Sequence, residues 1–397
     1  MKFRSQPAKG TQDILPEDMA VRNYVLDVIR KTYTQKGFTQ IQTPSVENIE
    51  LLTNSDGGEN LRMLFKILKR GEKLNLEDVT EASLTDLGLR FDLTLPLSRF
   101  YANNRSQLPI PFKSIQIGDV WRAERPQKGR YRQFTQCDVD IIGESSIIAE
   151  IELLTTVPEA IIRLGFTNFT IKINDRRLLK EMVLAADIDP SLFASVCITL
   201  DKADKIGVEG VKSELKEKDL TDLQIDALLQ RLTTNLSDLD SDAAKEMTTI
   251  IDTVSPLYPI EFDPTLVRGM GYYTGAIFEI ASNEFKGSLA GGGRYDTLMN
   301  KFQKEAVPAV GFSIGFERIC DLLKSKDFRV DPREKTALIV LDDVYLPKAV
   351  ALSQELAADD HIVSMFKVKA KKLGKKLSAL EEEGYTDIIV VDRQEAN

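Results

Sequence analysis

The stretch from Trp121 to Arg132 is the densest cationic segment of the chain. It holds five arginines and lysines against a single acid, Glu124. It lies between two strand-like segments, which predicts a long hairpin loop whose arginines project into one space. Arginine binds phosphate or carboxylate oxygens through paired N–H donors and stays charged when it is partly buried. The segment therefore favours an anion site, with a solvated basic turn as the alternative.

Directly downstream, residues 134–142 alternate between polar and apolar side chains. A strand places alternate residues on opposite faces. One face therefore carries an amide and two carboxylates, from Gln136, Asp138 and Asp140. Such acceptors suit a ligand that presents an ammonium or imidazole N–H. Two acids on an exposed strand face are the alternative interpretation.

Two further segments combine glycine with charged and aromatic residues. They run from Arg268 to Gly275 and from Gly291 to Asp296. Glycine lets the backbone approach a ligand closely, and the interleaved tyrosines can form pocket walls with a polar tip. Neither segment matches a phosphate-binding Walker loop or the dinucleotide fingerprint. Taken alone, each is more typical of a tight turn than of a site.

Arg318 follows a strand-like segment and falls in the first turn of a predicted helix. The helix macrodipole disfavours a cation at this end, so the position calls for an anionic partner. A bound anion is one candidate, and the neighbouring carboxylate of Glu317 is the structural alternative.

These residues depend on an α+β arrangement of helices and short strands. Apolar residues at helical spacing predict a helix over 18–33. Strand signals follow at 38–44, 89–94, 115–117, 134–142, 275–280 and 309–314, and the last of these runs into a helix that ends near Leu323. Short strands joined by turns, without regular βαβ alternation, predict an antiparallel sheet with flanking helices.

Changes in composition and in predicted secondary structure divide the chain into several parts. Residues 185–255 are mostly helical, acidic and poor in aromatics, which indicates a helical insertion between two parts of one core, 1–184 and 256–325. A charged linker occupies 326–333. Residues 334–397 carry β-branched runs at 337–341 and 388–391 with helical patterns between them, typical of a small α/β domain with parallel strands.

The composition excludes several classes of protein. With 397 residues, 43% hydrophobic and 28% charged, the chain suits two or three globular domains and not a disordered or fibrous protein. Three scattered cysteines argue against a disulfide framework, and no apolar run is long enough to span a bilayer. We therefore expect a cytoplasmic protein with no membrane partner. The single histidine, His361, excludes a catalytic triad or a histidine-rich zinc site.

Taken in order, the motifs resemble the histidyl-tRNA synthetase family, which belongs to the class II aminoacyl-tRNA synthetases. The segment from Lys9 to Pro16 looks like the opening of that family. The three class motifs correspond to 37–47 with Pro44, to 121–140, and to 311–318. The segments 268–275 and 291–296 are similar to the two histidine-specific signatures. The resemblance covers nearly the whole chain and implies the antiparallel sheet of class II enzymes.

The resemblance implies an enzyme that activates histidine with ATP to histidyl-adenylate and then transfers the histidyl group to tRNA(His). It assigns Arg122 and Arg268 to catalysis at the α-phosphate, with Arg122 also contacting the substrate carboxylate. The other ATP-binding residues that it implies are Glu124, Arg130 and Arg318. The histidine-binding residues that it implies are Asp92, Thr94, Gln136, Asp140, Arg268, Tyr272, Tyr273 and Tyr295. Mg²⁺ is expected with the phosphates, and no metal ligands are assigned.

The resemblance also implies a homodimer with Pro44 near the interface. At 334–397 it covers only part of the anticodon-binding domain of the family, which leaves both a natural short form and a truncated chain open. Two alternatives remain. A non-catalytic, histidine-sensing regulatory subunit of ATP phosphoribosyltransferase resembles the same core, although such proteins usually lack part of the substrate-binding set. A histidine-binding pseudoenzyme that detects uncharged tRNA is the other.

Overall fold

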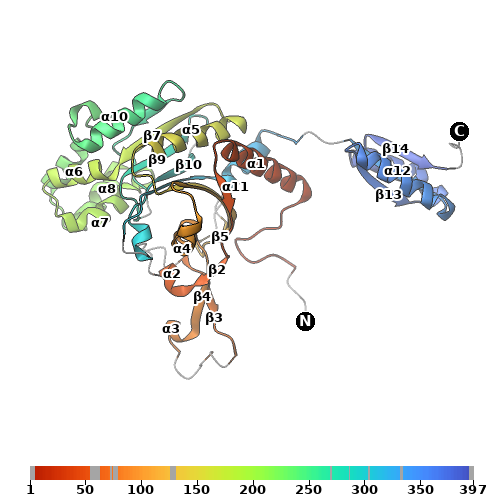
Figure 1. Ribbon diagram of the computed structural model, residues 1–397, viewed down its shortest axis with the longest axis horizontal. Coiled ribbons are helices and arrows are strands. Elements are labelled where there is room, and N and C mark those ends of the chain that lie inside the picture. Colours follow the sequence, from red (N-terminus) through yellow and green to blue (C-terminus); the bar gives the residue numbers. More distant parts are fainter. Residues whose placement is uncertain are drawn as a thin grey trace. The chain divides into compact units, whose positions relative to one another are not determined.

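The computed structural model describes residues 5–53, 63–71, 74, 79–125, 131–268, 271–285, 287–302, 305–330 and 334–392 (Figure 1). The chain forms two compact units, Met1–Lys326 and Asp327–Asn397. Among the helices within those ranges, none combines the length and the apolar character that a membrane span requires.

The first unit is built on an eight-stranded sheet in the order β1-β5-β6-β11-β10-β9-β7-β8. The strands are β1 Thr39–Ile41, β5 Phe112–Trp121, β6 Gln133–Ile142, β7 Phe169–Asp175, β8 Ile260–Phe262, β9 Ala276–Ser282, β10 Ser288–Arg294 and β11 Ala309–Ile314. Neighbours among the six central strands pair in the antiparallel direction. At the two edges, β1 pairs in parallel with β5, and β8 pairs in parallel with β7. The predicted antiparallel sheet with flanking helices is confirmed.

Three helices cover one face of this sheet: α1 Pro16–Gln35, α5 Ile148–Arg163 and α11 Phe316–Ser325 (Figure 1). Helix α1 begins with proline and two acids, which suit the first turn, and it buries Val21, Val25, Ile29 and Tyr33 at helical spacing. The helix predicted over 18–33 is thus confirmed. The apolar residues of β6 and β11 pack beneath these helices, which leaves the opposite face of the sheet for the polar residues.

The segment between β1 and β5 forms a smaller sheet and adjoining helices. The strands pair in the order β2-β4-β3. The elements are β2 Val46–Asn48, α2 Ile49–Thr53, β3 Lys66–Leu68, α3 Glu81–Leu84, β4 Thr85–Leu89 and α4 Thr94–Asn104. The strand predicted over 89–94 is wrong, because β4 ends at Leu89 and α4 begins at Thr94. The Asp92 carboxylate accepts a hydrogen bond from the Leu95 amide at 3.3 Å and so favours the start of a helix here.

Helices dominate the segment between β7 and β8. They are α6 Arg176–Ala185, α7 Phe193–Leu200, α8 Ala203–Lys216, α9 Asp222–Arg231 and α10 Asp242–Val254. Their apolar faces form a core of their own, centred on residues such as Val183, Leu215 and Leu228.

The second unit is a three-stranded parallel sheet in the order β13-β12-β14, with β12 Lys335–Val340, β13 Ile362–Lys367 and β14 Asp387–Val391. Helices α12 Leu346–Ala358 and α13 Leu373–Glu382 supply apolar side chains to separate clusters on this sheet. The predicted parallel strands are found, and β13 is an additional strand that the sequence pattern did not indicate.

Candidate active site

A cavity of about 420 Å³ lies over the polar face of β6 and reaches the first turn of α11. It gathers every site residue named from the sequence that the structure describes: Asp92, Thr94, Arg122, Glu124, Gln136, Asp140, Arg268, Tyr272, Tyr273, Tyr295 and Arg318. Arg130 lies outside the described residues. Residues from five separate regions of the sequence therefore meet in one place.

The polar face of β6 forms one wall of the cavity. Gln136, Asp138 and Asp140 all line it, while the intervening Cys137 and Val139 are fully buried on the other face. The predicted alternation is confirmed. Asp138 and Asp140 are only 5% and 3% exposed, so this wall is not the exposed acidic strand of the alternative interpretation.

Each acceptor on this wall is oriented by a neighbour. The Tyr295 hydroxyl donates to Asp140 Oδ1 at 2.6 Å, and Gln136 Nε2 lies 3.5 Å from both carboxylate oxygens of Asp138. The remaining acceptors, Asp140 Oδ2, Gln136 Oε1 and Asp92 Oδ2, are buried and have no hydrogen-bond partner among the described residues. Buried polar atoms are nearly always hydrogen-bonded. These three oxygens therefore match a ligand that carries N–H donors.

Burial also perturbs the acid–base behaviour of the three carboxylates. It raises the pKa of Asp92 to about 6, although the nearby Arg122 opposes the change. It raises the pKa of Asp138 to about 7. Burial, reinforced by the charge of Asp138, raises the pKa of Asp140 well above its usual value. Such a cluster costs free energy when it is ionised, and a cationic ligand would offset that cost.

Asp138→Asn is expected to stabilise the ligand-free protein, by on the order of 1–3 kcal/mol at pH 8. The folded-state pKa lies above that of an unfolded aspartate, so the ionised carboxylate opposes folding. This penalty is absent below pH 4 or so and complete above about pH 7, and the gain should shrink as the pH falls. Urea unfolding of the variant and the parent at pH 8 and pH 5 measures this gain in unfolding free energy. Asp252→Asn, at an exposed position of α10, is the control. An equal gain at both pH values would contradict the assignment.

Three tyrosines form an aromatic wall beside these acids. The rings of Tyr272 and Tyr273 lie 4.9 Å apart, and Tyr272 meets Tyr295 edge-on at 6.0 Å. Aromatic walls with polar tips suit a planar heterocycle that also needs hydrogen bonds.

The glycine-rich segment at 291–293 is the middle of β10, so the turn expected from its composition is wrong. Added side chains would collide with the site: a Cβ at Gly291 would overlap the Arg268 guanidinium, and one at Gly311 of β11 would overlap the Asp140 carboxylate. Glycine is therefore needed for close approach and not for an unusual turn. The floor of the cavity is bare backbone on which two charged side chains lie.

The other half of the cavity is cationic. Arg122 Nε donates to the Phe91 carbonyl at 3.0 Å, and its guanidinium lies 5.1 Å from the centre of the Phe134 ring. Arg268 is held by Glu279 of β9 at 3.1 Å. These contacts fix both guanidinium groups while leaving further N–H donors for an anion.

Arg318 lies in the first turn of α11, as predicted, but Glu317 is not its partner. Glu317 instead receives both Nη groups of Arg22 on α1, at 2.5 and 2.9 Å, and the Thr135 amide at 3.0 Å. Arg318 donates to the Ser288 carbonyl and has no carboxylate partner in the described parts of the chain. The structural alternative for Arg318 is therefore wrong, and its charge is available to an anion.

The basic loop differs from the prediction in one respect. Arg122 lines the cavity, whereas Arg132 is engaged with backbone carbonyls of Glu124 and Lys9. Its arginines therefore do not all project into one space. Arg22 and Phe134 are contributors that sequence reasoning missed. Arg22 gave no local signal, because its partner Glu317 lies 295 residues away.

Comparisons with known proteins agree on one family. The sequence model of histidyl-tRNA synthetase matches residues 10–319. A histidine–tRNA ligase from Leifsonia xyli subsp. xyli is 39% identical over 97% of this chain and 95% of its own length. The crystal structure of histidyl-tRNA synthetase from Nostoc sp. PCC 7120 superposes with a TM-score of 0.79 at 26% identity, over 96% of this chain and 90% of that one.

A second solved structure bears on the regulatory alternative. It is described as an ATP phosphoribosyltransferase regulatory subunit/histidyl-tRNA synthetase from Bacillus halodurans, and it has a TM-score of 0.79 over the whole of both chains. At 22% identity this likeness shows a shared fold alone.

Proposed function

Since the chain belongs to the histidyl-tRNA synthetase family, we propose that it is a histidine–tRNA ligase that activates histidine with ATP and charges tRNA(His). In the first step a histidine carboxylate oxygen attacks the α-phosphorus of ATP, and pyrophosphate leaves. In the second step a hydroxyl of the terminal ribose of the tRNA takes the histidyl group, and AMP leaves. The observation that carries the proposal is a single cavity with an acidic, aromatic half and a cationic half.

The acidic half is proposed to bind histidine. Asp92, Thr94 and Gln136 would surround the α-ammonium group, and the buried acceptors on Asp92 and Gln136 support this role. Asp140 would accept an imidazole N–H through its unpartnered oxygen, since its other oxygen is occupied by Tyr295. The tyrosine wall of Tyr272, Tyr273 and Tyr295 would enclose the ring.

The cationic half is proposed to bind ATP. Arg122 would bridge the substrate carboxylate and the α-phosphate, because it is bonded to Phe91 and its charge acts on the adjoining Asp92 of the acidic half. Arg268 would meet the α-phosphate from the floor of the cavity. Arg318 and Arg130 would hold the distal phosphates, and Glu124 would lie near the adenine. Fixed cations at the site of developing negative charge are a major source of catalysis in phosphoryl transfer.

Magnesium is proposed to accompany the phosphates of ATP. Over the described ranges, no group of three or more acidic, histidine or cysteine side chains is placed to hold a metal ion. Mg²⁺ usually keeps several waters and binds through substrate phosphates with one or two carboxylates. The ion would neutralise phosphate charge, while the arginines of the chain align the α-phosphate.

Histidine-dependent ATP–pyrophosphate exchange tests the activity and separates it from the regulatory alternative. Robust exchange is expected, because Arg122, Arg268 and Arg318 all line the cavity. Histidine binding without exchange would overturn the proposal in favour of a histidine-sensing regulator.

We further propose a cytoplasmic homodimer with Pro44 near its interface, in keeping with the first class II motif.

The second unit is proposed to be an anticodon-binding-like domain that contacts tRNA through lysines. The segment 367–376 holds six lysines, which the structure distributes over the end of β13 and the start of α13. Lys367 pairs with Asp343, and Lys376 lies 3.8 Å from Glu383. Four others are exposed and have no carboxylate partner in the described part of the unit: Lys369, Lys371, Lys372 and Lys375.

Replacing these four lysines by glutamine is expected to weaken tRNA binding while leaving histidine-dependent exchange intact. Each phosphate that a lysine no longer neutralises should flatten the log–log salt dependence of binding by about one unit. Titrations of tRNA at several salt concentrations measure the slope. The matched control replaces the same four residues by arginine, which keeps the charge. An unchanged affinity and slope in the glutamine variant would show that this surface does not meet tRNA.

A further inference from the structure

The end of β10 presents successive side chains to opposite faces of the sheet. Tyr295 points into the active-site cavity, where its hydroxyl donates to Asp140. Arg294 and Asp296, on either side of it in sequence, line a separate polar cavity of about 130 Å³ behind the sheet. Whatever fixes Arg294 and Asp296 therefore also fixes the ring of Tyr295.

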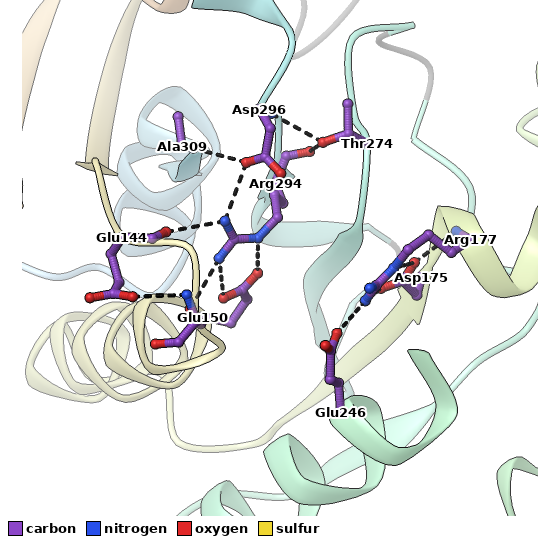
Figure 2. Close-up of polar contacts among 10 residues, drawn as sticks. Glu144, Glu150, Asp175, Arg177, Glu246, Thr274, Arg294, Asp296 and Ala309 are labelled. Atoms are coloured by element: carbon purple, nitrogen blue, oxygen red, sulfur yellow. Dashed lines mark hydrogen bonds and ion pairs between the residues drawn. The ribbon is translucent and has the colours of Figure 1, made fainter. Parts of the chain in front are cut away.

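Arg294 is held on the far side by a dense set of contacts (Figure 2). Its Nε and Nη2 groups form a bidentate pair with Glu150 of α5, at 2.5 and 2.7 Å. Its Nη1 group contacts Asp296 at 3.2 Å and the Glu144 carbonyl at 3.2 Å. The side chain is 9% exposed, so the ion pair is largely shielded from water. Bidentate pairs of this kind fix geometry more strongly than single contacts do.

Thr274 joins the second tyrosine segment to this set. It directly follows Tyr272 and Tyr273, and its amide donates to the Arg294 carbonyl at 2.8 Å. The Asp296 amide donates to Thr274 Oγ1 at 3.1 Å. Asp296 Oδ1 also accepts the Ala309 amide at 3.0 Å, which ties in the first residue of β11. One threonine thus links both segments that carry the tyrosine wall (Figure 2).

We infer that Thr274, Arg294 and Asp296 form a clamp that positions the tyrosine wall against Asp140 and thereby sets the affinity for histidine. The inference rests on the proposed function, because it takes the acidic half of the cavity to be the histidine site. The clamp residues act through the tyrosines and are positioning residues. In the cationic half, Phe91 holds Arg122 and Ser288 holds Arg318, outside the clamp, whereas Arg268 is held by Glu279 and also bonds to Tyr273. The clamp should therefore affect histidine more than ATP.

Thr274→Val tests this with little change in shape, since it removes the hydroxyl that accepts the Asp296 amide. The hydroxyl also donates to the Arg294 carbonyl at 3.4 Å, and loss of these two partly buried hydrogen bonds predicts a rise of about three- to tenfold in the KM for histidine. The KM for ATP and the kcat of pyrophosphate exchange should stay within about twofold of the parent. Thr274→Ser keeps the hydroxyl and should restore the parental KM for histidine.

Glu246→Gln provides the matched control. Glu246 of α10 lines the same polar cavity and pairs with Arg177 at 2.5 Å (Figure 2), and within the described residues Arg177 bonds further to Asp175 and not to Thr274, Arg294 or Asp296. The KM values of the Glu246→Gln variant for histidine and for ATP should equal those of the parent. An unchanged KM for histidine in Thr274→Val, or an equal rise in both KM values, would overturn the clamp. Absence of exchange in the parent would instead overturn the proposed function.

Discussion

Arg268→Ala is expected to reduce histidine-dependent ATP–pyrophosphate exchange by about two orders of magnitude or more. The guanidinium lies on the bare backbone of Gly291 and is held by Glu279, so it is aligned before substrates bind. Removing a preorganised charge at the reacting phosphate typically costs on the order of 3 kcal/mol or more. Histidine binding should stay close to normal, because the contact strengthens as the transition state forms.

Single-turnover formation of the adenylate, alongside histidine binding by calorimetry, measures both effects of the Arg268 substitution. Glu279→Gln is the companion variant, since it keeps the arginine but loosens its partner, and it should give a smaller loss. A threefold change in rate corresponds to less than about 1 kcal/mol of activation free energy. An activation rate for Arg268→Ala within about threefold of the parent would therefore rule out the assignment.

Asp140→Asn is expected to weaken histidine binding about tenfold to a hundredfold while changing ATP affinity little. A buried acceptor aimed at the imidazole would be replaced by an amide that can present N–H donors to it. The two dissociation constants, measured separately by calorimetry, give the ratio that matters. Tyr295→Phe is the control, because it removes the hydroxyl bonded to Asp140 but keeps the ring. Equal losses of histidine and ATP affinity would point to a folding defect instead.

Much of the fold was accessible from the sequence because its signals are local. The spacing of Val21, Val25 and Ile29 predicted α1, and the alternation of 134–142 predicted which side chains of β6 face the cavity. The β-branched runs of the second unit predicted two of its parallel strands. Each of these patterns reflects burial on one face, which the residues themselves encode.

The errors arose where a distant part of the chain decides the structure. Glycine composition at 291–293 indicated a turn, yet neighbouring strands and two charged side chains require glycine in the centre of a sheet. The 89–94 segment alternates like a strand, but a helix begins at Thr94, with the Asp92 carboxylate accepting a hydrogen bond from the Leu95 amide. Glu317 was the expected partner of the adjacent Arg318, but it pairs with Arg22 of α1 instead. No local pattern could have indicated that pairing.

The pairing of Arg22 with Glu317 has a consequence for biosynthesis. The arginine leaves the ribosome 295 residues before its carboxylate partner, and 113 residues before Thr135, which it also contacts. Contacts so distant in sequence form late, since chain closure over such lengths is entropically costly. The cationic half of the cavity, which we propose to bind ATP, therefore reaches its final charge balance only when α11 has been synthesised and has docked against α1. A nascent chain that stops short of α11 contains most of the acidic half of the cavity but lacks Arg318 and the Arg22–Glu317 pair.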